Sequence, residues 1–360
     1  MGPLKGIKVV EMSAIGPVPL AGMLLADMGA DVVVIDKAND PWKMSGDVLR
    51  RGKRSIELDM KSEQGVELCK QLITQADIVL EGFRPGVMER LGIGPDEFLT
   101  DNPKLIYGRM TGWGQTGPLS QAAGHDINYI ALTGALNAMG RATENPVPPL
   151  NLVGDYGGGT MFLIMGVLAA LHEMKTSGKG QVVDAAITEG TSNLMAMFYT
   201  MSSIGRWSTE RGVNLLDSAA HFYDTYQTSD KKYISIGAIE PHFYKIMREK
   251  MGLNDDDFAN QLDPRKWPEL KGKLATIVAG KTRDEWCELM EGSDACFAPV
   301  LDFKEAADHP HMQARNAYVE VGGLTQPAPS PRFSRTASKV RESSEIDHDL
   351  ESIRNDWELN

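Results

Sequence analysis

The stretch IKVVEMSAIGPVPLAGMLLADMGADVVVID, residues 7–36, is the part of the sequence that decides the fold. It begins with the β-branched run Ile7–Met12, continues with apolar residues at helical spacing over Leu20–Met28, and closes with DVVVID over Asp31–Asp36. Short β-branched runs predict strands, and apolar residues three and four positions apart predict a helix. The stretch therefore predicts a strand, a helix and a second strand that form one βαβ unit.

The rest of the first half continues this alternation. Further apolar strands are predicted at Ile78–Leu80, Leu105–Tyr107 and Val182–Ala185, and a helix is predicted over Ser62–Thr74. Strands that alternate with helices favour a parallel sheet covered by helices. We therefore expect an α/β protein whose large domain is Rossmann-like.

The character of the chain changes after two more predicted helices, Gly157–Lys175 and Thr188–Ile204. Tyr223–Gln227 and Tyr233–Ala238 predict two strands around a turn at Ser229–Lys231, followed by helices. The Pro-rich segment 326–332 indicates a linker, and the last 20 residues contain enough apolar positions to pack back as a short helix. We assign residues 1–187 and 330–360 to the large domain, 188–222 to a linker helix region, 223–310 to a smaller α+β domain and 311–329 to a return linker.

Composition narrows the class of partner and the compartment. The 49 acidic residues outnumber the 37 Lys and Arg residues and give a formal charge of −12, so no basic face is available to bind nucleic acid. The three cysteines, Cys69, Cys287 and Cys296, form no Cys-x-x-Cys pair, which fits a reducing compartment. We find no secretory signal and no run of about 18 apolar residues, and expect a cytoplasmic protein without a membrane span.

Two polar residues mark candidate chemistry. His125 stands in GHDINY, residues 124–129, and Asp155 stands 30 positions later in GDYGGG, residues 154–159. Both are predicted at the ends of elements, where side chains reach the crevice at the carboxyl ends of a parallel sheet. Each also has a structural interpretation, because His125 could be a core or surface residue and Asp155 a helix cap.

Other positions leave similar alternatives. The glycines 157–159 predict either a helix start that stabilises an oxyanion or a close packing of helices. Glu240, in GAIEPH, is either an exposed strand-end carboxylate or a partner that orients and charges an imidazole. Four cations, Lys37, Lys61, Arg84 and Arg90, could hold nucleotide phosphates or lie solvated on the surface.

Several motifs are missing. There is no G-x-x-x-x-G-K-[ST] loop, and no G-x-G-x-x-G follows the first strand. His309 and His311 have no carboxylate or cysteine partner at ligand spacing, so we predict no metal site.

The sequence resembles the family III CoA-transferases, and their racemase branch in particular, over nearly its whole length. The family motifs are GADV (29–32), GKRSIELD (52–59), DIVLEGFRPGV (77–87) and GWGQTGP (112–118), together with Leu4–Met12, Gly16-Pro17 and Gly124-His125-Asp126. The His of the GHD segment, the Asp of GDYGGG and Ile239-Glu240-Pro241 mark the racemase branch.

The resemblance implies an activity and an assembly. We expect an interlocked homodimer, with active sites between subunits, that interconverts (R)- and (S)-2-methylacyl-CoA thioesters through an enolate. His125 and Asp155 would serve opposite faces of the α-carbon, Glu240 would orient His125, and backbone N–H groups near Asp155 would bind the enolate oxygen. No cofactor or metal is expected, since coenzyme A is part of the substrate.

The resemblance also implies the contacts to the substrate. CoA would contact Ile15, Lys37, Leu58, Asp59, Met60, Lys61, Gly82, Arg84, Arg90, Gly124, Asp126 and Tyr129. At position 37 the family often has Arg, so this Lys keeps the charge but loses the bidentate fork. Met195, Met197 and Met201 would contact a mobile acyl chain, although a Met stripe is also ordinary helix core.

Two other functions compete with the racemase. In a CoA-transferase, the Asp155 carboxylate would attack the thioester and carry an acyl anhydride before CoA moves to a second acid. The combination of His125 and Glu240 argues against it. A non-catalytic CoA-binding protein is the third possibility, and the joint presence of His, Asp and Glu argues against that one.

Overall fold

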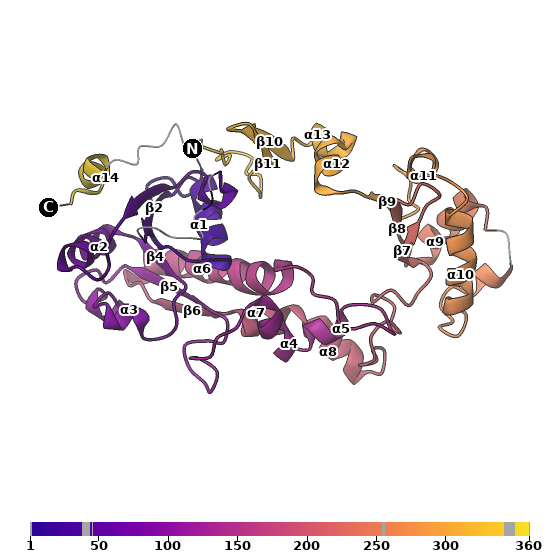
Figure 1. Ribbon diagram of the computed structural model, residues 1–360, viewed down its shortest axis with the longest axis horizontal. Helices are drawn as coiled ribbons and strands as arrows, with labels where there is room; N and C mark the ends of the chain where they lie inside the picture. The colour runs from indigo at the N-terminus through magenta and orange to yellow at the C-terminus, as the bar shows by residue number, and fades with distance from the viewer. Residues whose placement is uncertain (1, 38–43, 45, 254–255, 342–349, 360) are drawn as a thin grey trace. The chain divides into compact units, whose positions relative to one another are not determined.

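The computed structural model describes residues 2–37, 44, 46–253, 256–341 and 350–359, and it divides into two compact units (Figure 1). Unit 1 comprises Met1–Gly134, Pro149–Met195 and Asn316–Asn360; unit 2 comprises Ala135–Pro148 and Ala196–Arg315. Residues 135–148, which the sequence placed in the large domain, group with unit 2. Residues 188–195 and 316–329, which it placed in linkers, group with unit 1.

Unit 1 is built on a six-stranded parallel sheet, which confirms the Rossmann-like fold. The strand order is β3-β2-β1-β4-β5-β6. The bounds are β1 Lys8–Met12, β2 Asp31–Asp36, β3 Arg54–Glu57, β4 Ile78–Glu81, β5 Ile106–Thr111 and β6 Val182–Ala186. The chain reverses its direction of winding between β1 and β4, and this places a crevice at the carboxyl ends of those two strands.

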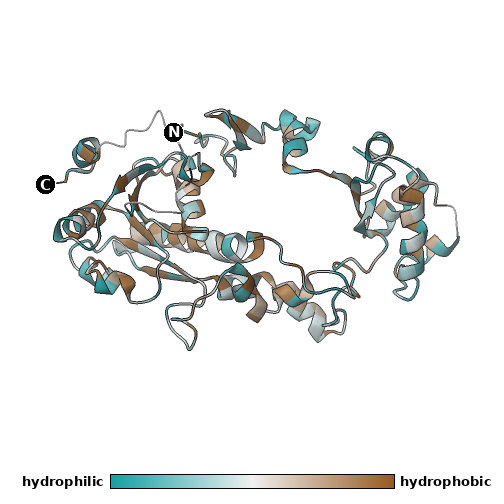
Figure 2. Cartoon of the chain, viewed as in Figure 1, coloured by the Kyte–Doolittle hydropathy of each residue, from teal (hydrophilic) through white to brown (hydrophobic). Residues whose placement is uncertain are grey.

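The sheet buries a separate apolar cluster on each face. Successive strand residues point to opposite faces, so Val9 of β1 joins the cluster under α1 and α6 while Val10 joins the one under α2 and α14. Figure 2 shows these strands and α6 in the brown of apolar residues. The helices of unit 1 are α1 Pro17–Asp27, α2 Glu63–Gln75, α3 Val87–Arg90, α4 Asp126–Leu132, α6 Met161–Ser177, α7 Ile187–Leu194 and α14 Leu350–Trp357, with short 3-10 turns at Val48–Arg50 and Pro95–Glu97.

The C-terminal segment is anchored on unit 1. Trp357 of α14 is fully buried, and its Nε1–H donates to Asp31 Oδ2 (2.8 Å), which confirms the predicted terminal helix. Upstream, the hairpin β10 Tyr318–Val321 and β11 Leu324–Pro327 is held by Arg51. The Arg51 guanidinium donates to Gln326 Oε1 (2.9 Å) and to Asp27 Oδ2 (2.6 Å). The return segment therefore carries a hairpin that the sequence did not predict.

The helix predicted to start at Gly157 starts five residues earlier. Leu152–Thr160 is a π-helical segment that runs directly into α6, so the glycines lie inside the helix and not at its N-terminus. A Cβ on Gly158 would stand 2.3 Å from Thr191 Oγ1, and one on Gly190 would stand 1.9 Å from the Gly158 carbonyl oxygen. The glycines therefore let α7 cross this helix at close range, which is the packing interpretation.

The continuous helical stretch Leu152–Ser177 is, among the described residues, the one long and apolar enough to cross a membrane by length and hydropathy. Leu163, Val167 and Leu171 on its inner side are buried against the sheet, as in the core helix of a globular protein. The helix predicted over Thr188–Ile204 is instead two, because α7 ends at Leu194 and α8 spans Ala196–Ser203.

Unit 2 is an α+β unit. Its antiparallel sheet has the order β7-β8-β9, from Tyr223–Gln227, Tyr233–Gly237 and Phe297–Val300. The helices are α5 Ala135–Ala138, α8, α9 Pro241–Met251, α10 Trp267–Val278, α11 Arg283–Met290, α12 Phe303–Asp308 and α13 Pro310–Ala314, with a 3-10 turn at Asp256–Ala259. The predicted strands are confirmed, and β9 is an addition.

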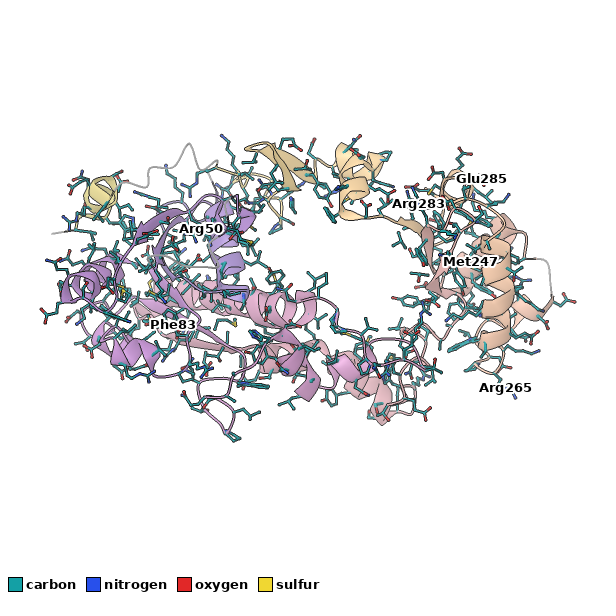
Figure 3. The ribbon with its side chains drawn as sticks, in the orientation of Figure 1. Arg50, Phe83, Met247, Arg265, Arg283 and Glu285 are labelled. Atoms are coloured by element: carbon teal, nitrogen blue, oxygen red, sulfur yellow. The ribbon has the colours of Figure 1, made fainter. Side chains whose placement is uncertain are left out.

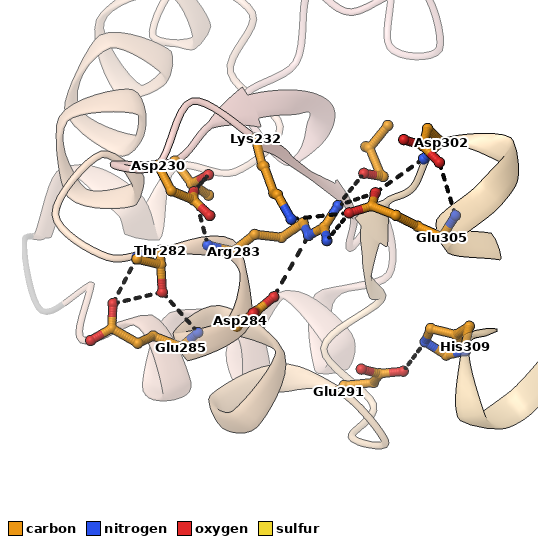
Figure 4. Close-up of polar contacts among 12 residues, drawn as sticks. Asp230, Lys232, Thr282, Arg283, Asp284, Glu285, Glu291, Asp302, Glu305 and His309 are labelled. Atoms are coloured by element: carbon orange, nitrogen blue, oxygen red, sulfur yellow. Dashed lines mark hydrogen bonds and ion pairs between the residues drawn. The ribbon is translucent and has the colours of Figure 1, made fainter.

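A buried arginine fixes α12 to the rest of unit 2 (Figure 4). Arg283, the first residue of α11, donates through Nη1 and Nη2 to Glu305 (2.8 Å each). Glu305 stands in the first turn of α12, where Asp302 caps the helix. Arg283 is 6% exposed and the Glu305 side chain 31% exposed, so this bidentate pair holds α12 against the start of α11 from a partly shielded position.

Candidate active site

Unit 1 contains a cavity of about 880 Å³ at the carboxyl ends of the parallel strands. The loops that follow β1, β2, β3, β4 and β5 all contribute to its wall, as the reversal of strand order between β1 and β4 requires. Its volume lies within the range of small-molecule sites. The lining residues are Met12–Ile15, Pro17, Val18, Ile35–Lys37, Leu58–Lys61, Gly82, Phe83, Leu91, Met110–Gly112, Gly124, His125, Tyr129, Asp155 and Ile187.

His125 reaches the cavity from the start of α4. Its backbone is extended, and it forms the N-cap of that helix. Its N–H donates to Asn128 Oδ1 (3.1 Å), and the Asn128 N–H donates back to the His125 carbonyl (2.8 Å). These two bonds fix the backbone of His125 while its side chain stays exposed, as a group that must meet a substrate requires.

Asp155 reaches the same cavity from the π-helical segment. A Cβ at Gly16 would lie 2.9 Å from Asp155 Oδ2, and Gly16 has a φ of +80°, so both space and backbone conformation demand glycine there. Asn151 Nδ2 lies 3.5 Å from the same carboxylate oxygen. The start of α1 and the start of the π-helical segment thus enclose the Asp155 carboxylate.

Burial changes the acidity of Asp155. Desolvation is the largest cause and raises the pKa of this carboxyl, the negative charge of Asp126 raises it further, and Asn151 and His125 oppose the rise. Tyr129, which also lines the cavity, has its pKa raised first by burial and then by the charge of Asp155. A carboxyl with a raised pKa is a better proton donor near neutral pH, since more of it carries the proton.

The N–H of Asp155 is not free to bind an enolate oxygen. It donates to Asp126 Oδ1 (2.7 Å). The expectation that backbone N–H groups near Asp155 bind the enolate therefore does not hold for this group and stays a prediction for its neighbours. The sequence could not reveal this, because the acceptor lies 29 positions away.

A buried ion pair supports the loop that follows β4. Arg109 Nε donates to Glu81 Oε1 (2.8 Å), and Arg109 Nη1 donates to Glu89 Oε1 (2.7 Å). Glu81 Oε2 in turn accepts the N–H of Phe83 (2.7 Å), a cavity residue whose position Figure 3 shows. The Glu81 carboxylate therefore links the loop after β4, which lines the cavity, to Arg109 of β5.

The structure brings together most of the residues that the sequence assigned to CoA binding. The predicted residues that line the main cavity are Ile15, Lys37, Leu58, Asp59, Met60, Lys61, Gly82, Gly124 and Tyr129. Arg84 instead lines an adjoining cavity of about 420 Å³, which shares His125 and Tyr129 with the first. Neither cavity is lined by Arg90 or Asp126, and Asp126 is 9% exposed.

The remaining predicted residues lie outside the two cavities. Met195 follows α7 at the end of a unit 1 segment, while Met197, Met201 and Glu240 belong to unit 2. Met197 is 51% exposed, and Glu240 is exposed at the N-cap of α9, where its side chain makes no capping bond. The roles assigned to these four residues stay predictions.

Sequence reasoning missed part of the cavity wall. Ser13, Ala14, Phe83, Thr111 and Gly112 line it because each lies at or just after the end of a parallel strand. That position was the available signal, although small and uncharged side chains carry no mark of their own. Within the described part of the chain, no group of three or more His, Cys, Asp or Glu residues could hold a metal ion.

Fold and cavity together define an α/β protein with a cavity at the topological switch point of a parallel sheet, lined by a histidine and by a carboxyl of raised pKa. The family model for CoA-transferase family III matches residues 4–344. The chain belongs to this family.

Three similar proteins narrow the comparison. The chain is 44% identical to the mouse protein named alpha-methylacyl-CoA racemase, over 98% of this chain and 92% of that protein. It is 43% identical to the human protein of the same name, over 92% of this chain and 87% of that protein. The crystal structure of a CaiB/BaiF family protein from Brucella suis superposes with a TM-score of 0.84 at 26% identity and covers 99% of both chains.

Proposed function

We propose that this protein is an α-methylacyl-CoA racemase, an isomerase that interconverts (R)- and (S)-2-methylacyl-CoA thioesters. The observation that carries the proposal is that His125 and Asp155 line one cavity at the carboxyl edge of the sheet. The names of the mouse and human relatives at 44% and 43% identity support the same activity.

The chemistry requires a base and an acid on opposite faces of the α-carbon. In one direction His125 takes the α-proton, the electron pair moves to the thioester oxygen as an enolate, and Asp155 delivers a proton to the other face. In the reverse direction ionised Asp155 is the base and protonated His125 is the acid. The raised pKa of Asp155 suits this reversal, because it brings the carboxyl nearer to the pKa range of an imidazole.

A CoA-transferase that uses Asp155 as a nucleophile is the second candidate, and the family description favours it. There the carboxylate attacks the thioester carbonyl and CoA leaves as a thiolate, which gives an acyl anhydride on Asp155. The thiolate then attacks the aspartyl carbonyl and expels the first acid as a carboxylate. The second acid takes CoA by the same steps in reverse and regenerates Asp155. That reaction needs an ionised Asp155 and gives His125 no task. The racemase also needs an ionised Asp155 in one direction, so the observation that favours it is His125 in the wall of the same cavity.

The two activities separate in one assay. Purified protein is incubated with pure (S)- or (R)-2-methylacyl-CoA, with and without an isotopically labelled free acid, and the products are separated on a chiral column. The racemase gives the same epimer mixture from either starting compound, and no labelled acyl-CoA forms. Acyl-CoA that carries the label, with the α-carbon unchanged, would replace the racemase by the transferase.

The cavity suits the CoA part of the substrate. Lys37 and Lys61 are exposed in its wall at the ends of β2 and β3, where their ammonium groups are available to phosphates, while Leu58 and Ile15 offer apolar surface. The contacts of Arg84 and Arg90 with CoA, and those of the three methionines with the acyl chain, stay predictions from the sequence.

Lys61→Ala is expected to raise KM for the acyl-CoA about tenfold with kcat nearly unchanged, because a lost phosphate contact weakens ground state and transition state alike. Steady-state kinetics of epimerisation measure both constants. Lys104→Ala is the matched control, since Lys104 is exposed just before β5, at the amino ends of the parallel strands and away from the cavity. An unchanged KM in Lys61→Ala would remove this residue from the CoA site.

The homodimer is supported by the apolar surface that unit 1 leaves exposed. Leu132 of α4 is 65% exposed, Met165 of α6 is 59% exposed, and Leu194 of α7 is 48% exposed. Large exposed apolar residues on neighbouring helices typically mark an interface. We expect analytical ultracentrifugation to give twice the chain mass of 39.4 kDa, and a monomer at micromolar concentration would contradict the dimer. Interlocking of the two chains, a cytoplasmic location and catalysis without a cofactor stay predictions.

A further inference from the structure

Asp126 is a buried carboxylate next to the catalytic histidine in sequence and next to the catalytic aspartate in space. It is the first residue of α4, directly after His125, and it is 9% exposed. Its Oδ1 accepts the Asp155 N–H (2.7 Å), while its Oδ2 is buried and has no hydrogen-bond partner. A carboxylate oxygen without a partner at such depth is costly, so a structural cap alone is a poor reason for an aspartate here.

The surrounding backbone is shaped to receive this carboxylate. A Cβ on Gly154 would stand 2.2 Å from Asp126 Oδ1, so only glycine lets the two segments come this close. The side chain of Asp126 on α4 thus holds the N–H of Asp155 within the π-helical segment.

We propose that Asp126 is a positioning residue of the racemase. Its side chain holds the backbone of Asp155 in place beside His125. Its negative charge repels that of Asp155 and so favours the protonated form of the Asp155 carboxyl. The proposal rests on the proposed function and replaces, for this residue, the CoA contact expected from the sequence. His125 and Asp126 are consecutive, and Asp126 holds the Asp155 backbone. Movement of α4 would therefore displace His125 and Asp155, the two proton-transfer groups, together.

The charged groups that act on Asp155 are few. The charge of Asp126 raises its pKa and that of His125 lowers it. The other elements packed on the π-helical segment are α1, α6, α7, β5 and β6. Their charged or titratable residues are Asp27 at the end of α1, His172, Glu173 and Lys175 at the end of α6, Glu189 of α7, Tyr107 and Arg109 of β5, of which Arg109 pairs with Glu81, and Asp184 of β6. None of these is among the causes of the shift at Asp155.

Two variants separate the electrostatic effect of Asp126 on Asp155 from its backbone contact. Asp126→Asn keeps an oxygen acceptor for the Asp155 N–H and removes only the charge, so the pKa of Asp155 falls. The acidic limb of the kcat/KM–pH profile, which reports the lower of the two pKa values, therefore moves to lower pH. Asp126→Ala removes the acceptor as well, and we expect kcat to fall about 10- to 100-fold with KM for the acyl-CoA little changed, because displacement of a reacting group by about 1 Å costs on that order.

The experiment combines the pH profiles of wild type, Asp126→Asn and Asp126→Ala with a titration of the ¹³C-labelled Asp155 carboxyl by NMR, assigned by its loss in Asp155→Asn. Near-UV circular dichroism selects the folded variants, and the wild-type and Asp126→Asn titrations stand alone should Asp126→Ala not fold. An unchanged acidic limb and an unchanged Asp155 titration in Asp126→Asn would overturn the proposal. A raised KM with wild-type kcat in either variant would overturn it in favour of a CoA contact.

The titration also distinguishes failure of this inference from failure of the proposed function. A wild-type protein that does not epimerise acyl-CoA would refute the racemase. In that case, a downward shift of the Asp155 pKa in Asp126→Asn would still establish the electrostatic link between the two carboxyls.

Discussion

Asp155→Asn is expected to lower the rate of epimer inversion by about 10² to 10⁴ while it still exchanges the α-proton of one epimer with solvent. The reason is that His125 and Asp155 transfer protons on opposite faces of the α-carbon. With Asp155 neutralised, His125 can remove a proton and return one to the same face. Exchange with retention then replaces inversion.

The measurement uses each pure epimer in D₂O, with deuterium followed by mass spectrometry and configuration by chiral separation. His125→Ala is the complementary variant and is expected to retain exchange only for the other epimer. Asp96→Asn, an exposed acid on a 3-10 turn, is the matched control and should behave as wild type. Inversion at the wild-type rate in Asp155→Asn, or exchange of the same epimer by both variants, would contradict the assignment of faces.

Lys53→Met is expected to destabilise unit 1 by about 3 to 5 kcal/mol, because it leaves an uncompensated buried charge. Lys53 Nζ lies 2.6 Å from Glu11 Oε2, and the two residues are 3% and 2% exposed. Burial raises the pKa of Glu11 and lowers that of Lys53, and each partner opposes the shift of the other. Lys53 also donates to the Pro19 carbonyl (2.8 Å), so the pair fastens α1 to β1.

Urea denaturation followed by far-UV circular dichroism measures this loss. The double variant Glu11→Leu with Lys53→Met removes both charges and should recover most of the stability, since replacing a buried pair by apolar residues is often close to neutral. Lys104→Met, at an exposed position, controls for the loss of a lysine as such. Equal stability of the Lys53 and Lys104 variants would show that the pair contributes nothing to the fold.

The sequence predicts the centre of the fold better than its edges. The run from Ile7 to Asp36 predicts β1, α1 and β2 because those strands are buried on both faces and read as continuous apolar segments. β3, Arg54–Glu57, was missed because it is an edge strand in which Ile56 alone is fully buried. β9 was missed for a related reason, since Phe297–Val300 contains Pro299 and alternates between half-buried and exposed residues.

The sequence likewise predicted only a part of the candidate site. Position at strand and helix ends made His125 and Asp155 candidates, and the resemblance to the family assigned their roles. Both residues line the cavity. The bond between Asp126 and the Asp155 backbone depends on the approach of α4 to the π-helical segment, which leaves no trace in residue spacing. The pKa of Asp155 is likewise set by three-dimensional burial, which the sequence alone does not give.

The most direct test of the racemase is the incubation of wild-type protein with pure (S)-2-methylacyl-CoA in D₂O, without any free acid. An enolate that is formed on one face and protonated on the other requires the (R) product to carry one deuterium at the α-carbon. We predict that its mass rises by that one deuterium and that the mixture reaches the same epimer ratio from either starting compound. An α-carbon that keeps its proton and its configuration would contradict the account.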